Sequence, residues 1–390
     1  MTASEPQTGE KVFVAMSGGV DSSVAAALLK EQGFEVVGVG LKLCEPGGSP
    51  AAACCGIEAM EDARRVAESI SIPFTVLDFR DTFRELVIDY FCSSYAAGMT
   101  PNPCVRCNQV IKFEKLLEVA AGAEAARLAT GHYARIEHDE STGTLRLRKG
   151  IDESKDQSYF LYSLTQAQLE RALFPLGSMR KSETRKIARR FGLRVHDKAE
   201  SQDVCFLGDM PYVDYLEAHA GVASVPGPII LDETGAVVGE HAGLHRYTVG
   251  QRHGLGVSMS EPVYVVDIDI GANSLVVATR ASFLRQRSIL LTEVNYIAEP
   301  PSGPLEVSAR TRYRKPEVSA MLEPVDAATA VVRFDEPQEP TAPGQSVVLY
   351  SGDEVVAGGI AGRGQAPSTF LSTAIPFCCN DRVDKKVDGA

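Results

Sequence analysis

The 390-residue sequence contains no apolar run that approaches the roughly 20 residues a membrane-spanning helix requires. Its first ten residues are polar and include Glu5 and Glu10, so they offer neither the basic start nor the apolar core of a secretory signal. These absences argue against a membrane or secreted protein and lead us to expect a cytoplasmic one. In that compartment the nine cysteines are expected to be thiols, metal ligands or catalytic groups rather than a disulfide framework.

The chain also lacks the surplus of basic residues that would draw it to nucleic acid through overall charge, because its formal net charge is −12 at pH 7. Any contact with phosphates must therefore come from local clusters. Two basic clusters exist, one from Arg180 to Arg190 and one from Arg310 to Lys315. Taken alone, each cluster is better explained as the solvated charged face of a helix or strand.

The chain also lacks a lysine at the position that a Walker phosphate loop requires. The segment SGGVDSS, residues 17–23, lies between an apolar run, 11–16, and a helical run, 24–29, which predicts a strand, a tight turn and a helix start. Glycines permit close backbone approach to a ligand, and the free N–H groups of a helix start favour phosphate. A Walker loop would place a lysine near its end, whereas the nearest lysine is Lys30. The segment is therefore either another kind of phosphate loop or a turn without a ligand.

From Lys11 to Tyr133, apolar strands alternate with amphipathic helices. The expected strands are 11–16, 36–43, 74–79 and 127–132, and the helices between them include 58–69, 82–95 and 111–121. Such alternation predicts an α/β fold with a parallel sheet covered by helices on both faces. Ligands then bind at the carboxyl ends of the strands, where the glycine loop and residues 130–133 are expected.

A CxxC pair lies in the segment TPNPCVRCN, residues 100–108, where two prolines predict an extended loop before the next helix. The pair is consistent with half of a zinc site, a redox pair, two ligands of an iron–sulfur cluster, or a nucleophile with a neighbour. Cys54 and Cys55 are adjacent rather than spaced as a second zinc pair. A further cysteine, Cys205, lies in a second polar cluster, residues 200–206.

The rest of the chain is mainly β in character. Residues 134–150 alternate as a β-hairpin and resemble an insertion that decorates the sheet, and residues 212–220 are expected to form a short helix. Beyond it, short alternating strands separated by Gly and Pro predict a small sheet module and a β-barrel. We expect a catalytic domain over 1–209, a central β-rich domain over 210–285, a barrel over 286–362 and a disordered tail over 363–390 that contains Cys378 and Cys379.

Seven segments stand in a fixed order: SGGVDSS, TPNPCVRCN, ATGHYARI, KDQSYFLY, ESQDVCFLGD, HRYTVGQRHGLG and ARTRYR. Together they resemble the tRNA-specific 2-thiouridylase family of the ATP pyrophosphatase (PP-loop) superfamily, over about residues 11 to 362. The resemblance implies an adenine nucleotide alpha hydrolase-like PP-loop domain followed by the central domain and a tRNA-binding barrel. It also implies a reaction in two steps. ATP, with Mg²⁺, first adenylates the 2-carbonyl of the wobble uridine in tRNA and releases pyrophosphate. Sulfur then displaces AMP.

The resemblance also assigns roles to individual residues. Cys107 is the implied nucleophile and Cys205 the cysteine that carries or attacks a persulfide, while Asp21 is implied to orient the metal or the phosphates. The ATP-contacting positions are Ala15, Met16, Ser17, Gly18, Gly19, Val20, Asp21, Ser22, Leu41 and Gly131. The tRNA-contacting positions are Asn102, Pro103, Cys104, His132, Lys155, Asp156, Gln157, Arg312, Tyr313 and Gln345. For His132 a purely structural role is the alternative.

One position departs from the family pattern. Many members carry Asp where this chain has Cys104, so Cys104, Cys107 and Cys205 are candidate ligands of a [4Fe–4S] cluster with one iron left open for sulfide. The other sulfur route is persulfide chemistry without iron. The implied sulfur donor is accordingly a cysteine desulfurase, a sulfur relay protein or free sulfide. The competing functions are a PP-loop amide-forming ligase and a non-catalytic, tRNA-binding sulfur carrier.

Overall fold

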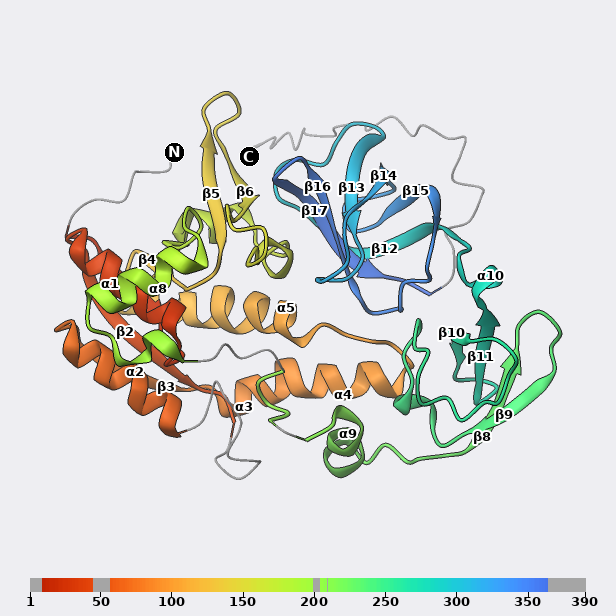
Figure 1. Ribbon diagram of the computed structural model, residues 1–390. Helices are drawn as coiled ribbons and strands as arrows, with labels where there is room; N and C mark the ends of the chain where they lie inside the picture. Colours follow the sequence, from red (N-terminus) through yellow and green to blue (C-terminus); the bar gives the residue numbers. More distant parts are fainter. Residues whose placement is uncertain (1–8, 45–56, 199–203, 209, 364–390) are drawn as a thin grey trace, which may run out of the picture.

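The computed structural model describes residues 9–44, 57–198, 204–208 and 210–363 (Figure 1). The cysteine pairs 54–55 and 378–379, residues 200–203 of the second polar cluster, and the expected tail from residue 364 onward lie outside these ranges. Within them, no helix combines the length and the apolar character that crossing a bilayer requires.

The N-terminal part is built on a parallel sheet with strand order β3-β2-β1-β4-β7. Its strands are β1 (Lys11–Ala15), β2 (Glu35–Lys42), β3 (Phe74–Asp78), β4 (Arg127–Ala129) and β7 (Ala172–Leu173). The predicted α/β class is confirmed. Because β1 leads through a helix to β2 on one side and pairs with the later strand β4 on the other, the order reverses between β1 and β4. A crevice for a ligand opens at such a reversal.

Helices cover both faces of this sheet, since side chains of a strand alternate between its faces. Val12 and Val14 of β1 pack into one apolar cluster with α1 (Val20–Glu31), α2 (Ile57–Ser69) and α8 (Lys181–Arg190). Phe13 packs into a second cluster on the opposite face. That cluster includes side chains of α4 (Asp89–Ala96), which follows α3 (Arg80–Phe83) and the π-helical segment η1 (Arg84–Ile88), and of η2 (Asn108–Leu116).

The CxxC pair lies in a helix, so the extended loop predicted for residues 100–108 is wrong from Pro103 onward. Helix α5 (Pro103–Cys107) runs on through η2 into α6 (Leu117–Gly122). Pro103 occupies the first helical position, where no backbone N–H is needed, and the Asn102 side chain caps the helix by accepting from the Val105 N–H at 3.2 Å. The two prolines therefore start the helix rather than delay it.

The hairpin of β5 (Ala134–Asp139) and β6 (Thr144–Lys149) belongs to the sheet of the C-terminal barrel rather than to the parallel sheet. Strand β6 pairs with the barrel strand β17 (Glu354–Ala361), and Arg146 forms an ion pair with Glu354 at 2.6 Å. Leu145 and Leu147 point to the shared core. One polar and one apolar face thus fasten the hairpin between the two sheets. Figure 1 shows the β5–β6 hairpin beside the barrel.

The remaining chain confirms the predicted β character. Helix α9 (Tyr212–Ala220) precedes a four-stranded sheet with order β10-β11-β8-β9, formed by β8 (Gly227–Leu231), β9 (Val237–His241), β10 (Val263–Asp269) and β11 (Ser274–Thr279). After α10 (Arg280–Phe283), six strands close into an antiparallel barrel through a pairing of β12 with β17. They are β12 (Gln286–Tyr296), β13 (Leu305–Arg310), β14 (Val318–Pro324), β15 (Ala330–Gln338), β16 (Ser346–Ser351) and β17.

Candidate functional site

One open cavity of about 1480 Å³ gathers most of the predicted site residues. It lies at the carboxyl ends of β1, β2 and β4 and reaches the start of α5 and the segment that follows β13. Predicted residues on its wall are Ala15, Met16, Ser17, Asp21, Ser22, Leu41, Pro103, Cys104, Cys107, Gly131, His132, Lys155, Asp156, Gln157, Cys205, Arg312 and Tyr313. Positions far apart in sequence therefore share one space.

The glycine loop after β1 is held in shape from within. Gly18 has φ +69°, and a Cβ there would lie 2.1 Å from the carbonyl oxygen of Ala59. The Ser22 hydroxyl accepts from the Ser17 N–H at 3.2 Å and faces the cavity. Ser23 is fully buried and donates to the Gly19 carbonyl at 2.7 Å. The sequence suggested that both serine hydroxyls reach a ligand, but the hydroxyl of Ser23 faces the loop itself.

The loop after β4 packs directly on the glycine loop. A Cβ at Gly131 would lie 2.7 Å from the Ser22 nitrogen and 2.8 Å from the Asp21 carbonyl carbon. Only a residue without a side chain allows this approach. The contact places Gly131 and His132 beside the start of α1, at the point where the strand order reverses.

Asp21 is held by side chains that sequence reasoning did not connect with it. Lys181 Nζ lies 2.7 and 2.8 Å from the two carboxylate oxygens of Asp21, and the Tyr133 hydroxyl donates to one of them at 2.9 Å. Thr184, on the same helix as Lys181, lies 2.9 Å from the Tyr133 hydroxyl. In the sequence Lys181 is one member of a basic helix, and no local pattern relates it to a loop 160 residues earlier.

Three thiols face the cavity from two segments. Cys104 is exposed and Cys107 buried, both on α5, and Cys205 is half-buried on the segment before α9. Both thiols of the CxxC pair therefore lie within one helix, which begins at Pro103. In the described part of the chain, no three His, Cys, Asp or Glu side chains group as a metal ion requires. The three thiols are thus in one cavity but do not form a ready ligand set for a cluster.

His132 is neutral near pH 7. Burial lowers the pKa of its imidazole well below the ordinary 6.5, and the nearby Lys112 lowers it further. Its Nδ1 lies 2.7 Å from the Thr130 hydroxyl, and its ring packs edge-on against Phe174 with centroids 6.0 Å apart. A neutral ring held in this way suits a hydrogen bond to an uncharged base or ribose rather than an ion pair with phosphate.

The barrel side of the cavity is basic. Seven of the lining residues are Lys or Arg and three are Asp or Glu, so the cavity is electropositive although the whole chain is acidic. Arg310 contacts Asp156 and Glu317 at 3.3 and 2.7 Å, and Arg312 donates to the Val249 carbonyl at 2.7 Å. The Tyr313 ring packs on Phe160 with centroids 4.4 Å apart.

Of the predicted tRNA-contacting residues Lys155, Asp156 and Gln157, the last two use their side chains to bind the protein backbone. Asp156 is buried and accepts from the Gly150 N–H at 3.1 Å, while the side-chain oxygen of Gln157 accepts from the Tyr133 N–H at 3.0 Å. These bonds position the segment that carries Lys155 on the cavity wall.

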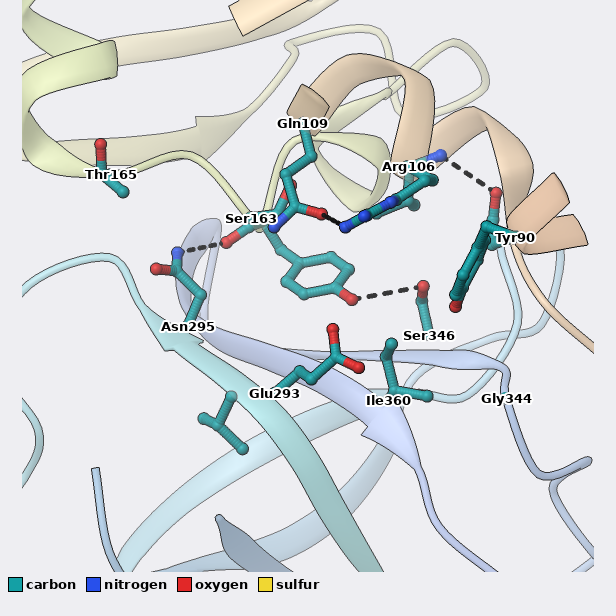
Figure 2. Close-up of a pocket in the computed structure, with 14 residues that line it drawn as sticks. Tyr90, Arg106, Gln109, Ser163, Thr165, Glu293, Asn295, Gly344, Ser346 and Ile360 are labelled. Atoms are coloured by element: carbon teal, nitrogen blue, oxygen red, sulfur yellow. Dashed lines mark hydrogen bonds between the residues drawn. The ribbon is translucent and has the colours of Figure 1, made fainter. Parts of the chain in front are cut away.

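Asn102 and Gln345 do not line the large cavity. Asn102 caps α5 and borders a second cavity of about 250 Å³ between that helix and the barrel, shown in Figure 2, where Arg106 donates to Gln109 at 3.2 Å. Gln345 donates to the Thr100 carbonyl at 3.2 Å. Both side chains thus help to place the start of α5 against the barrel.

A parallel α/β sheet with a glycine-rich anion loop at its reversal point, facing thiols and a basic barrel, defines a nucleotide-using enzyme of the PP-loop type. Family models match the chain over three ranges: the tRNA methyl transferase HUP domain over 10–209, the tRNA methyl transferase PRC-barrel domain over 213–279 and the aminomethyltransferase beta-barrel domain over 286–361.

Curated relatives name the family more closely. The tRNA-specific 2-thiouridylase MnmA of Geotalea uraniireducens is 48% identical over 90% of this chain and 94% of its own length. The proteins of the same name from Geobacter metallireducens, 48% identical, and Moorella thermoacetica, 49% identical, cover 90% and 89% of this chain and 96% and 98% of their own lengths. The chain belongs to the tRNA-specific 2-thiouridylase family.

The glycine loop offers a first test. We expect Gly18→Ala to weaken ATP binding about tenfold or more, because a Cβ at that position collides with the Ala59 backbone and displaces the loop N–H groups. Gly235→Ala is the matched control, since Gly235 has the same φ of +69° with open space around it. That control should lose about 1–2 kcal/mol of folding stability and keep ATP affinity. Equal ATP affinity in both variants would contradict the proposed role of the loop.

The lowered pKa of His132 predicts a pH effect on stability. Below pH 6.5 the unfolded chain binds a proton at His132 that the native state resists, so the free energy of unfolding falls as the pH falls, by up to about 1.4 kcal/mol per pH unit. Urea unfolding between pH 7.5 and 5.5 should show a flatter dependence for His132→Asn. His138→Asn, at an exposed position of β5, should keep the wild-type slope. Identical slopes for all three proteins would refute the assignment.

Proposed function

We propose that the protein is an ATP-dependent tRNA 2-thiouridylase. It adenylates the 2-carbonyl oxygen of the wobble uridine, releases pyrophosphate, and replaces the adenylated oxygen with sulfur so that AMP leaves. The observation that carries the proposal is that the glycine loop, Cys107 and Cys205 line one cavity. A carbonyl oxygen leaves readily only after activation, so phosphate chemistry and sulfur chemistry must meet at the same atom.

The ATP half of this reaction uses the loop after β1. Ser17 and Ser22 face the cavity beside the start of α1, where backbone N–H groups favour phosphate oxygens. The carboxylate of Asp21 is the anionic group of that loop and suits Mg²⁺, which would offset the charge of the pyrophosphate. Leu41 and Gly131 line the adjoining wall, where the nucleoside is expected to lie.

The tRNA half uses the opposite wall. The basic side chains around Arg312 suit the anticodon backbone, and an acidic chain must concentrate its phosphate contacts in such a patch. The target uridine must leave the anticodon stack to reach the thiols. The Phe160 and Tyr313 pair provides aromatic faces on which an extruded base can stack, and neutral His132 provides a hydrogen bond.

For sulfur transfer we propose persulfide chemistry. A persulfide on Cys205 attacks the uridine C2, the C2–O bond breaks, and AMP departs with the oxygen. The Cys107 thiolate then attacks Cys205 Sγ, which leaves the sulfur on the base and a Cys107–Cys205 disulfide that an external thiol must reduce. The donor that loads Cys205 is a cysteine desulfurase or a sulfur relay protein. Direct use of free sulfide belongs to the cluster route, which we do not favour because the described residues do not gather its ligands.

We further propose the division of labour expected from the sequence, with catalysis in residues 1–209, a central domain over 210–285 and tRNA binding by the barrel over 286–362. A cytoplasmic location accords with the reduced thiols that this chemistry needs. An amide-forming ligase of the same superfamily would have no use for the paired thiols, and a non-catalytic sulfur carrier would have no use for the phosphate loop. Methyl transfer, the activity named in two of the family models, likewise does not call for an ATP loop facing thiols.

The two half-reactions should separate by mutation. Pyrophosphate release from ATP should require uridine-containing tRNA and should fall at least about 100-fold in Asp21→Ala, as expected when a charged group is removed from a phosphate site. Cys205→Ser should keep that release and lose thiolation. Measuring both products for each variant, with wild-type protein and tRNA lacking the wobble uridine as controls, tests the scheme. Wild-type thiolation by Cys205→Ser would rule out the sulfur role of Cys205.

Iron distinguishes the two sulfur routes. If persulfide chemistry operates, iron-free protein supplied with a persulfide donor thiolates tRNA at the full rate, and Cys104→Ser retains most of the activity. Anaerobic reconstitution followed by iron and sulfide analysis supplies the comparison. Activity that appears only after reconstitution, and disappears in Cys104→Ser, would replace the persulfide route with a [4Fe–4S] cluster bound by Cys104, Cys107 and Cys205.

A further inference from the structure

We infer that Lys181 is an ATP-phosphate ligand of this enzyme and takes the part that a Walker lysine plays in other phosphate loops. The inference rests on the proposed use of ATP and extends it to a residue outside the loop. Lys181 is 8% exposed, yet it lies on the wall of the large cavity together with Ser17 and Ser22 of the loop. Its ammonium group contacts both carboxylate oxygens of Asp21.

The backbone of Lys181 is held separately from its side chain. Lys181 is the first residue of α8, and its N–H donates to Asp152 at 2.9 Å, while the Arg180 N–H donates to Glu183 at 2.7 Å. These two N–H groups at the helix start are therefore already occupied by carboxylates. The group that α8 presents to the cavity is the ammonium at the end of a flexible four-carbon stem.

Other lysines near the loop are committed elsewhere. Lys198 donates to the Gly18 carbonyl at 3.2 Å and pairs with Asp62 at 2.7 Å, and it does not line the cavity. Lys112 lines the cavity but donates to Asn108 at 2.9 Å, on the helix that carries the thiols. Lys181 thus combines a place on the cavity wall with a contact to Asp21 of the proposed phosphate loop.

When ATP binds, Asp21 and Lys181 can each exchange the other for a new partner of opposite charge. An ammonium this deeply placed needs a counter-charge, and without nucleotide Asp21 supplies it. Magnesium-bound ATP brings both a cation that suits Asp21 and anionic oxygens that suit Lys181. Tyr133, which donates to Asp21 at 2.9 Å, holds the carboxylate while the lysine stem turns toward the phosphates. We therefore expect Lys181 to touch ATP rather than only to neutralise Asp21.

A double-mutant cycle on ATP binding tests this inference without tRNA. The full chain carries Lys181→Met in two backgrounds, wild type and Asp21→Asn, and ATP affinity is measured by calorimetry in the presence of Mg²⁺. A phosphate contact predicts that Lys181→Met weakens ATP binding about 10- to 100-fold in both backgrounds. Lys186→Met, at an exposed position of the same helix, is the control and should change affinity less than about twofold.

If Lys181 only neutralises Asp21, then Lys181→Met has no effect on ATP affinity once Asp21 is Asn, and the inference is overturned. Thermal unfolding of each variant shows whether the protein remains folded, and Lys181→Arg provides a second variant that keeps the charge and should recover part of the affinity. If the wild-type protein releases no pyrophosphate in response to tRNA, the proposed function is refuted. The double-mutant cycle would still show whether Lys181 binds ATP phosphates.

Discussion

The close packing of two loops, one after β1 and one after β4, determines the position of the whole site. Gly131 approaches the Ser22 nitrogen so closely that a side chain there would collide with the start of α1. This contact lies where the strand order of the parallel sheet reverses, so the proposed phosphate site lies in the crevice that the fold provides. The same contact places the carboxylate of Asp21, which in turn contacts Lys181 and Tyr133.

In the proposed reaction, sulfur must also reach the activated carbon of the uridine, and helix α5 places thiols in the cavity for this step. Asn102 caps this helix, Gln345 of the barrel donates to the Thr100 carbonyl just before it, and Cys104 and Cys107 project from it into the cavity. The hairpin β5–β6 fastens the barrel to the catalytic part through ion pairs such as Arg146 with Glu354. The positions of the thiols and of the basic barrel surface are therefore coupled to the position of the phosphate loop.

Local patterns predicted much of this arrangement. Alternation and turn residues predicted the parallel sheet, helix α9, the central strands and the barrel. The ordered motifs of the family resemblance predicted most of the segments that line the cavity. Sequence reasoning failed where long-range contacts decide. It read the prolines around Cys104 as a loop, although Asn102 and Pro103 begin a helix, and it assigned the hairpin to the parallel sheet, although Glu354 pairs with Arg148 across the strands. It also missed Lys181, because no spacing rule relates that residue to Asp21.

The central claim is that ATP activates the 2-carbonyl oxygen of a tRNA uridine inside this cavity. The most direct measurement uses tRNA whose wobble uridine carries ¹⁸O at the 2-position, incubated with the enzyme, ATP and a sulfur donor. Mass spectrometry of the products should find one ¹⁸O in AMP and none in pyrophosphate or water, because the carbonyl oxygen leaves bonded to the α-phosphorus. Thiolated tRNA formed together with unlabelled AMP would contradict the account.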